Sequence, residues 1–457
     1  MFDFSVHLIS FLVLTGAITV GYLFVKMPGV RKTFLPASVA GGLMLLVLGP
    51  EVLGIFPGSD PIEETFYEVW EPLPGLLITV IFAMLFLGKP LRSLRGMWKL
   101  AAPQAAFGQT IAWGYYAIAG LSVMFILGPL LGAHPLTAAL LEISFGGGHG
   151  TAAGLGPVFQ EFNFQAGQEM AVAMATTSLF ITLAVGFIAI NIARRRGILT
   201  NRPTPYQQVK GMVYHRRIVA ELDRAGISLR EELGFMNVIR HVILVVFSVA
   251  LAYGIHQLLL LIENTTWANY DIKVFGYMPT FVFGLFSGMI AQAIWIRMGM
   301  KISRPLVDLI SGGVLAILVS TAIATMKLGF LAEDGLVFLG IVVTGVAWVL
   351  FCFVFLAKHM FPKDWFTNAI ITIGQAMGTT ATGLLFANIV DPKQRTGAVE
   401  SFGYKQLMFE PIVGGGIATA LSIPAISFLG LPTFTAIAAA VCIAWLIFGI
   451  VSFRKKS

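Results

Sequence analysis

Two clusters of glycine and hydroxyl-bearing residues interrupt an otherwise apolar chain, and they lie half a chain apart. The first occupies residues 144–155 and reads SFGGGHGTAAGL, and the second occupies residues 374–384 and reads GQAMGTTATGL. Glycine lets the backbone approach a ligand closely, and the N–H groups at the start of a half-helix attract an anion. Hydroxyl and carbonyl oxygens suit a hard cation. Two such breaks in corresponding halves of a chain indicate the binding site of a transporter.

The small and polar residues of these clusters are the candidate ligands. Those for the solute are Ser144, Gly147, Gly148, His149, Gly150, Thr151, Gln375, Gly378, Thr379, Thr380 and Thr382. Those for a hard cation are Ser144, Thr151, Thr379, Thr382 and Glu410, and the resemblance described below implies that the cation is Na⁺. In the alternative interpretation the glycines only allow close helix packing and the threonines hydrogen-bond within their own helices. The density of glycine disfavours a plain helix and favours the binding role. His149 could orient the solute, carry a proton or bond a carbonyl.

Two acidic residues, Glu142 and Glu410, fall inside apolar stretches, where a carboxylate is costly and is a functional candidate by default. We take both as candidates for ion coupling. Glu410 precedes Pro411, which lacks a backbone N–H, and the three glycines 414–416 follow, so this stretch is expected to be partly unwound. Glu410 could bind Na⁺, carry a proton, or simply hydrogen-bond a neighbour such as Gln406.

Enzymatic function is not indicated. The chain shows no nucleophile–base constellation and no nucleotide-binding loop, and its histidines and cysteines lack metal-ligand spacing. Cys352 and Cys442 are interpreted as small buried hydrophobic residues. We expect no cofactor.

The composition is that of a polytopic membrane protein, with 57% hydrophobic and only 12% charged residues. The net charge of +7 reflects cytoplasmic loops and does not indicate nucleic acid. Apolar stretches predict eleven membrane spans, the first of them retained rather than cleaved. They are 5–25, 36–55, 73–90, 103–128, 168–192, 238–262, 278–296, 307–330, 336–357, 399–421 and 431–453. The interrupted segments 137–160 and 366–390 are predicted to be re-entrant hairpins that enter and leave on one side.

The distribution of basic residues tests this topology. Of the 30 Lys and Arg residues, all but Lys273 and Lys327 fall on one predicted side. Counting either hairpin as a full crossing would destroy that alternation. The N-terminus is therefore predicted outside and the C-terminus in the cytoplasm, with the first hairpin entering from outside and the second from inside.

This topology predicts an all-α membrane protein with two inverted repeats of five transmembrane helices, each carrying one re-entrant hairpin. An odd number of spans in each half inverts the second copy. The predicted parts are repeat 1 (1–192), a cytoplasmic linker (193–237), repeat 2 (238–421) and an appended C-terminal helix (422–457). Paired interruptions in inverted repeats indicate a transporter whose site lies where the hairpins meet.

Several motifs resemble the bacterial glutamate:sodium symporter family. They are GGHGT at 147–151, EMAVAMAT at 169–176, the segments 36–43 and 279–282, and the second hairpin from Gly374. The resemblance implies an inverted-repeat carrier, a homodimer, Na⁺ coupling and an elevator-like movement of a transport core against a scaffold. The chain departs from the family pattern at Gln375, where a histidine is usual, and at Glu142 and Glu410, where small or apolar residues are expected. Its C-terminal helix also extends beyond the family's usual end.

The resulting hypothesis is a secondary carrier of the bacterial cytoplasmic (inner) membrane that couples Na⁺ entry to uptake of glutamate. Its partners would be a small anionic amino acid, Na⁺, membrane lipids and a second copy of the chain. The alternative is a carrier of the same fold for another small carboxylate, with proton coupling suggested by Glu142 and Glu410. An ion channel is disfavoured, because no ring of charged residues and no carbonyl filter motif is visible.

Overall fold

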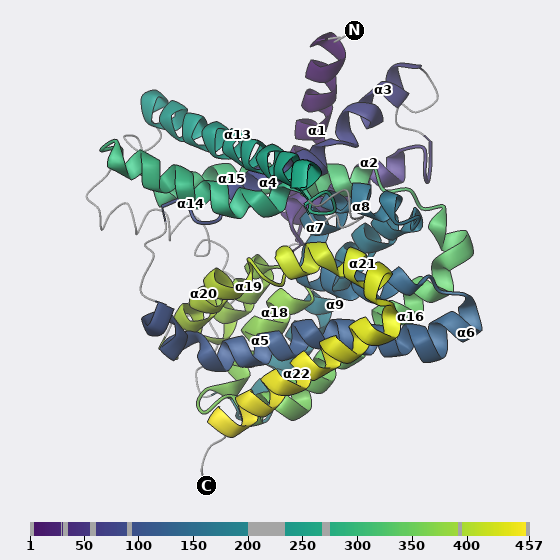
Figure 1. The fold of residues 1–457 in the computed structure, drawn as a ribbon, viewed down its shortest axis with the longest axis vertical. Helices are drawn as coiled ribbons and strands as arrows, with labels where there is room; N and C mark the ends of the chain where they lie inside the picture. Colours follow the sequence, from purple (N-terminus) through teal and green to yellow (C-terminus); the bar gives the residue numbers. More distant parts are fainter. Residues whose placement is uncertain are drawn as a thin grey trace. The chain divides into compact units, whose positions relative to one another are not determined.

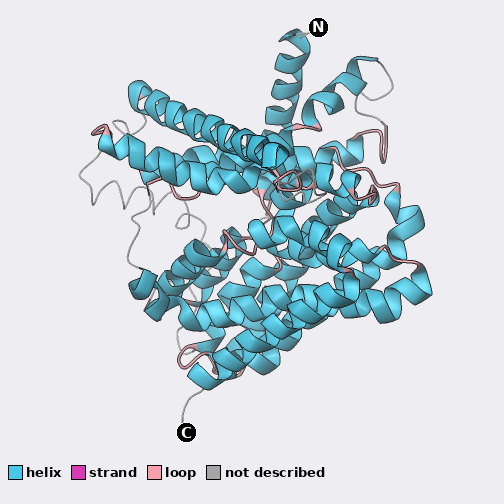
Figure 2. Cartoon of the chain, viewed as in Figure 1, coloured by secondary structure: helices cyan, strands magenta, loops and turns pink. Residues whose placement is uncertain are grey.

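The computed structural model describes residues 4–28, 30, 35–54, 61–88, 94–199, 234–266, 275–391 and 395–453. Within these ranges every regular element is a helix and there is no strand (Figure 2). Most of the predicted linker 193–237 lies outside the described residues. The prediction of an all-α membrane protein is confirmed, whereas the inverted repeat and the re-entrant hairpins remain predictions.

Nine helices in the described part of the chain are long and apolar enough to cross a membrane, which supports a multi-pass membrane protein. They are Val6–Val25, Phe66–Met84, Arg95–Leu131, Ala166–Arg195, Phe235–Thr266, Thr280–Arg297, Arg304–Ala324, Phe330–Met360 and Leu431–Phe453. Two predicted spans differ. The span expected at 36–55 is the shorter helix Ala37–Leu48, and the span expected at 399–421 is not one continuous helix.

The chain forms two compact units, and each unit takes segments from both halves of the sequence. Unit 1 comprises Met1–Pro90, His149–Val158 and His215–Leu328, and unit 2 comprises Leu91–Gly148, Phe159–Tyr214 and Gly329–Ser457. The long helices of unit 1 are α1 (Phe4–Val25), α2 (Ala37–Leu48), α3 (Pro61–Trp70), α4 (Leu73–Met84), α13 (Phe235–Thr266), α14 (Thr280–Arg297) and α15 (Arg304–Ala324).

Unit 1 is built on α4, which packs against α13, α14 and α15. A small-residue contact brings two backbones together, since a side chain at Gly288 would collide with the Ala83 carbonyl. The C-terminal end of α4 is capped by Arg304, whose guanidinium donates to the carbonyls of Met84 (3.1 Å) and Leu87 (2.7 Å). Arg304 also pairs with Asp308 at 2.5 Å. This cap satisfies carbonyls that the helix itself leaves open.

Unit 2 is organised around α5 (Leu94–Ser122), which lies beside α22 and also contacts α16, α18 and α20 (Figure 1). Its other elements are η2 (Val123–Leu127), α6 (Gly128–Leu131), η3 (Pro135–Ala139), η4 (Glu142–Gly146), α9 (Ala166–Arg195), α16 (Phe330–Phe351), η6 (Cys352–Leu356), α17 (Ala357–Met360), α18 (Trp365–Ala376), α19 (Thr380–Val390), α20 (Ala398–Phe409), α21 (Ile417–Leu429) and α22 (Leu431–Phe453). The buried Gln104 on α5 joins two of them, because its amide donates to Asn368 Oδ1 (3.0 Å) and to Ala398 O (3.4 Å).

Three interruptions of the helices matter for the site. The first follows the π-helical η4, where Gly147 N–H donates to Glu142 O at 2.9 Å and Gly148 adopts a φ of 71°. The second separates α18 from α19, which pack against each other as a helical pair. The third separates α20 from α21 at residues 410–416, where Gly414 and Gly415 have φ values of 89° and 98°. Proline without an N–H followed by glycines at positive φ explains why 399–421 is not a single helix.

Candidate functional site

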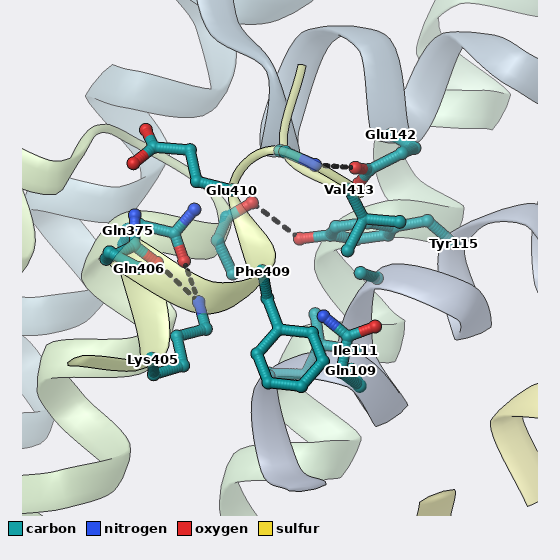
Figure 3. Close-up of a pocket in the computed structure, with 15 residues that line it drawn as sticks. Gln109, Ile111, Tyr115, Glu142, Gln375, Lys405, Gln406, Phe409, Glu410 and Val413 are labelled. Atoms are coloured by element: carbon teal, nitrogen blue, oxygen red, sulfur yellow. Dashed lines mark hydrogen bonds between the residues drawn. The ribbon is translucent and has the colours of Figure 1, made fainter. Parts of the chain in front are cut away.

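A small cavity lies inside unit 2, bounded by α5, η4, the end of α18, α20 and the break after α20 (Figure 3). The space open to the centres of water molecules is about 20 Å³. This is enough for one or two water molecules and far less than a glutamate needs. The charged residues that line the cavity are Glu142, Lys405 and Glu410.

Lys405 is the buried cation of this cavity, with a relative exposure of 6%. Its Nζ donates to Gln375 Oε1 at 2.8 Å and to Gln406 Oε1 at 2.7 Å, as the dashed lines of Figure 3 show. The absence of a side chain at Gly108 makes room for it, since a Cβ there would lie 2.6 Å from Lys405 Cε. The ammonium is thus held by oxygen acceptors from α18 and α20 against the face of α5.

The cavity carries a net negative charge when all three ionisable side chains are charged. Both Glu410 and Glu142 attract the Lys405 ammonium electrostatically. Two carboxylates and one ammonium leave one negative charge, with Glu142 and Lys405 buried and Glu410 only half-buried. Charge held away from water is costly unless it is compensated, so one further positive charge near the two carboxylates would be favoured.

Glu142 is completely buried, and its two carboxylate oxygens differ in their hydrogen bonding. Oε1 accepts a hydrogen bond from Gly414 N–H at 2.5 Å and another from the Thr419 hydroxyl at 3.2 Å. Oε2 has no hydrogen-bond partner among the described residues. The carboxylate folds back over Gly146, where any Cβ would collide with it. The π-helical turn and Gly146 together position this side chain beside the third interruption.

Two further hydrogen bonds tie the second interruption to the cavity. The Gln406 amide, whose oxygen accepts from Lys405, donates through Nε2 to Thr380 Oγ1 at 3.1 Å. The Tyr115 hydroxyl donates to Ala376 O, the last residue of α18, at 2.8 Å. A change in the backbone at 377–379 would therefore shift Thr380 and, through it, the Gln406 side chain that accepts a hydrogen bond from Lys405.

The candidates from the first cluster are divided between the two units. Ser144, Gly147 and Gly148 belong to unit 2, whereas His149, Gly150 and Thr151 belong to unit 1. The Ser144 hydroxyl donates to Leu140 O within its own helix, which is the behaviour that the alternative interpretation expects. His149 and Thr151 are buried in α7 (Gly148–Gly154), where the space beside Gly150 is filled by Ile78.

The candidates from the second cluster surround the break between α18 and α19. Gln375 lines the cavity, and Thr380 reaches it through Gln406. Thr379 caps α19 by accepting from Thr382 N–H at 3.2 Å, and the two hydroxyls lie 3.0 Å apart. Thr379, Thr382 and Gly378 do not line the cavity, whereas Glu142 and Glu410 do.

Sequence reasoning missed Lys405, Gly108 and Thr419. Lys405 was counted with the loop charges because it lies only six residues inside the predicted span 399–421, but the structure buries it. The available signal was the one used for Glu410, namely an ionisable residue inside an apolar span. Gln406, considered only as a partner of Glu410, instead bonds Lys405 and Thr380.

Interrupted helices around a charged cavity, in a chain with several membrane-length helices, define a polytopic membrane protein with an internal polar site. The comparison with protein families is more particular. Residues 6–394 match the family described as sodium/glutamate symporter, so the chain belongs to that family. The resemblance seen in the motifs is thereby confirmed. No curated protein and no solved structure matches the chain.

Family membership makes the chain a transporter rather than an enzyme, with Na⁺ as the coupling ion. The match covers only part of the cavity lining. Glu142 and Gln375 lie within the matched residues, whereas Lys405 and Glu410 follow the end of the match at residue 394.

Proposed function

We propose that this protein is a secondary active transporter that couples Na⁺ entry to glutamate uptake across the bacterial cytoplasmic membrane. Family membership supports the class of transporter and the ion. The single observation that supports the location of the site is the buried Lys405, held by Gln375 and Gln406 inside a cavity bordered by interrupted helices. An ammonium in such a place is the natural partner of a substrate carboxylate.

The charges of the cavity supply a physical reason for Na⁺ coupling. Glutamate is an anion, and the cavity carries one excess negative charge when Glu142, Glu410 and Lys405 are all charged. An anionic solute cannot enter such a site favourably unless cations enter with it, because uncompensated charge is costly away from water. Each Na⁺ that accompanies glutamate offsets one negative charge. The solute and the ions would therefore bind together.

Glutamate binding requires the cavity to enlarge, because about 20 Å³ is room for water or an ion. The side chains that could move aside are Gln375 and Gln406, whose amide oxygens accept the hydrogen bonds from the Lys405 ammonium. In this proposal a substrate carboxylate replaces those oxygens on Lys405. The hydrogen bond from Gln406 to Thr380 then links that exchange to the second interruption.

The division into two units supports an elevator-like mechanism, in which unit 2 is the transport core and unit 1 the scaffold. Each unit contains segments from both halves of the chain, as intertwined repeats would require. The inverted repeats 1–192 and 238–421, the outside N-terminus and the homodimer belong to the same proposal. A cysteine-accessibility scan of the N- and C-terminal ends in intact cells tests the predicted orientation.

The deciding experiment is uptake of radiolabelled glutamate by proteoliposomes that contain the purified full-length protein. We expect accumulation under an inward Na⁺ gradient and little accumulation when K⁺ or choline replaces Na⁺. Competition by unlabelled aspartate, glutamine and dicarboxylates defines the solute. Equal uptake with and without Na⁺, or no uptake under either condition, would contradict the proposal.

A second candidate is a carrier of the same fold for another small carboxylate with proton coupling. The observation that favours it is the pair of carboxylates in the cavity, Glu142 and Glu410, either of which could carry a proton. Uptake driven by an inward proton gradient in Na⁺-free buffer would favour this candidate over the first.

A further inference from the structure

We infer that Glu142, Tyr116, Thr419 and Ser422 form a Na⁺ site inside unit 2, beside the Lys405 cavity. This inference rests on the proposed Na⁺-coupled transport and gives the ion a location that none of the glycine and threonine clusters supplies. The four side chains come from η4, α5 and α21. They bring one carboxylate and three hydroxyl groups together in a completely enclosed place.

The first argument is the unused oxygen of Glu142. Its Oε1 accepts two hydrogen bonds, whereas Oε2 has none among the described residues, although the side chain has no exposure at all. A buried carboxylate with an open oxygen needs either a proton or a cation beside it. The Lys405 ammonium donates to Gln375 and Gln406 instead, so it does not fill this position.

The second argument is an independent polar group at the same place. The Tyr116 hydroxyl is buried to 1% exposure and, among the described residues, makes no hydrogen bond of good geometry. Its neighbours are the hydroxyls of Thr419 and Ser422, with which it interacts weakly, and it is within electrostatic range of Glu142. Buried hydroxyls normally make well-formed hydrogen bonds, so a poorly satisfied Tyr116 hydroxyl in the neighbourhood of the open Glu142 oxygen indicates room for a ligand there.

The third argument is the type of ligand that these groups would take. The Ser422 hydroxyl donates to Thr419 O, and the Thr419 hydroxyl donates to Glu142, so their oxygens keep lone pairs for a cation. A set made only of oxygens, with a single carboxylate, suits a hard monovalent cation. The charge count agrees when all three side chains are charged, because one Na⁺ would then neutralise the excess negative charge left by Glu142, Glu410 and Lys405.

The geometry of the third interruption provides a link between this site and the solute cavity. Gly414 N–H donates to Glu142 Oε1, and Gly415 N–H donates to Thr419 Oγ1 at 3.2 Å. Both donors belong to the non-helical segment between α20, which carries Lys405, and α21, which carries Thr419 and Ser422. A cation bound at Glu142 would hold this segment in place and with it the end of α20. Ion binding and solute binding would thereby stabilise each other.

The test is Na⁺-specific thermal stabilisation of the purified full-length protein in detergent. The midpoint of unfolding is measured in NaCl, KCl and choline chloride at constant ionic strength and without glutamate. We expect a saturable increase of the midpoint with Na⁺ alone, since a ligand of the folded state stabilises it. In Glu142→Gln the Na⁺ concentration for half-maximal stabilisation should rise by about tenfold or more, because a charged ligand is lost.

Tyr116→Phe removes a hydroxyl with little change of shape, and it should weaken Na⁺ stabilisation while leaving the midpoint in choline unchanged. The matched control is Glu263→Gln, a second buried carboxylate whose oxygens already accept backbone N–H groups from Phe275 and Gly276. That control should keep the full Na⁺ response. A wild-type protein without a Na⁺-specific shift, or Glu142→Gln with the wild-type Na⁺ response, overturns the site.

This result is separable from the uptake experiment. If Na⁺ stabilises the protein through Glu142 but glutamate is not transported, the ion site stands and the solute assignment fails. If glutamate uptake depends on Na⁺ and Glu142→Gln leaves that dependence unchanged, the transporter assignment stands and the ion site fails. Stabilisation that follows pH but not Na⁺ shows that a proton neutralises Glu142, and this also overturns the site.

Discussion

Two buried glutamates, Glu263 in unit 1 and Glu142 in unit 2, have nearly the same exposure of 1% and 0% and very different surroundings. Glu263 Oε2 accepts Phe275 N–H at 2.7 Å and Oε1 accepts Gly276 N–H at 3.1 Å, so both oxygens are used to fix the chain near the start of α14. Glu142 uses one oxygen twice and leaves the other open. Burial of an acid therefore does not by itself indicate function, whereas incomplete hydrogen bonding of a buried acid does.

The largest effect is expected from removing the cation that compensates Glu142. Lys405→Met leaves two carboxylates in the cavity without their ammonium, and breaking a buried charge arrangement costs about 3–5 kcal/mol. The variant should show a large decrease in the free energy of unfolding, measured by thermal or chemical unfolding in detergent. The matched control is Lys327→Met, since Lys327 is 67% exposed and its ion pair with Glu71 is long at 3.9 Å. A Lys405→Met protein as stable as that control would show that the cavity needs no ammonium.

The next largest effect is expected at Glu263, the buried glutamate whose two oxygens both accept hydrogen bonds. Glu263→Gln replaces a carboxylate that accepts two backbone N–H groups, and hydrogen bonds to a charged group are worth about 1.5–3 kcal/mol. We expect a loss of that size in the free energy of unfolding, and the loss should be equal in NaCl and in choline chloride. A loss that appears only in the presence of Na⁺ would mean that Glu263 also binds the ion, and the contrast with Glu142 would disappear.

Gly146, which lies against the Glu142 carboxylate, allows the role of Glu142 to be tested without changing any charge. In Gly146→Ala the new Cβ collides with the Glu142 carboxylate, and overpacking of this kind costs about 1–3 kcal/mol. Displacement of the carboxylate should also remove most of the Na⁺-specific stabilisation. Gly313→Ala in α15 is the control, because a Cβ at Gly313 meets no atom within 4 Å. If both variants keep the wild-type response to Na⁺, the position of the Glu142 carboxylate does not matter for the ion.

The smallest effect concerns a hydroxyl that acts on the cavity through a neighbour. Thr380→Val removes the acceptor of the Gln406 amide, and one such hydrogen bond contributes about 0.5–1.5 kcal/mol. The KM for glutamate should rise by about two- to tenfold, with no change in the melting midpoint beyond that of the control Thr265→Val. The exposed Thr265 hydroxyl bonds only its own helix, to Leu261 O and Ile262 O. An unchanged KM would separate the second interruption from the solute site.

The sequence predicted where the helices are interrupted, but it did not predict which residues come together around the cavity. The runs around Gly147 and Gly378, and Pro411 with its following glycines, are local signals, because proline and glycine restrict or free the backbone at their own positions. The helix ends at Ala376 and Phe409 agree with those signals. The all-α membrane class followed in the same way from composition and apolar length.

The composition of the cavity could not be predicted, because its contacts join residues that are far apart in the chain. Lys405 and Gln375 are 30 residues apart, and Glu142 and Gly414 are 272 residues apart. No pattern within a single segment encodes such a pairing. Tyr116 illustrates the same limit, since an aromatic residue in a membrane span is ordinary until its buried hydroxyl is found near hydroxyls and a carboxylate from distant segments.

The family match ends at residue 394, before three side chains of the cavity. Lys405, Gln406 and Glu410 come from α20 and the break after it, and Lys405 and Glu410 are two of the three charged residues that line the cavity. Substitutions confined to these positions would change the charge and the hydrogen bonding of the cavity and leave the matched segment intact.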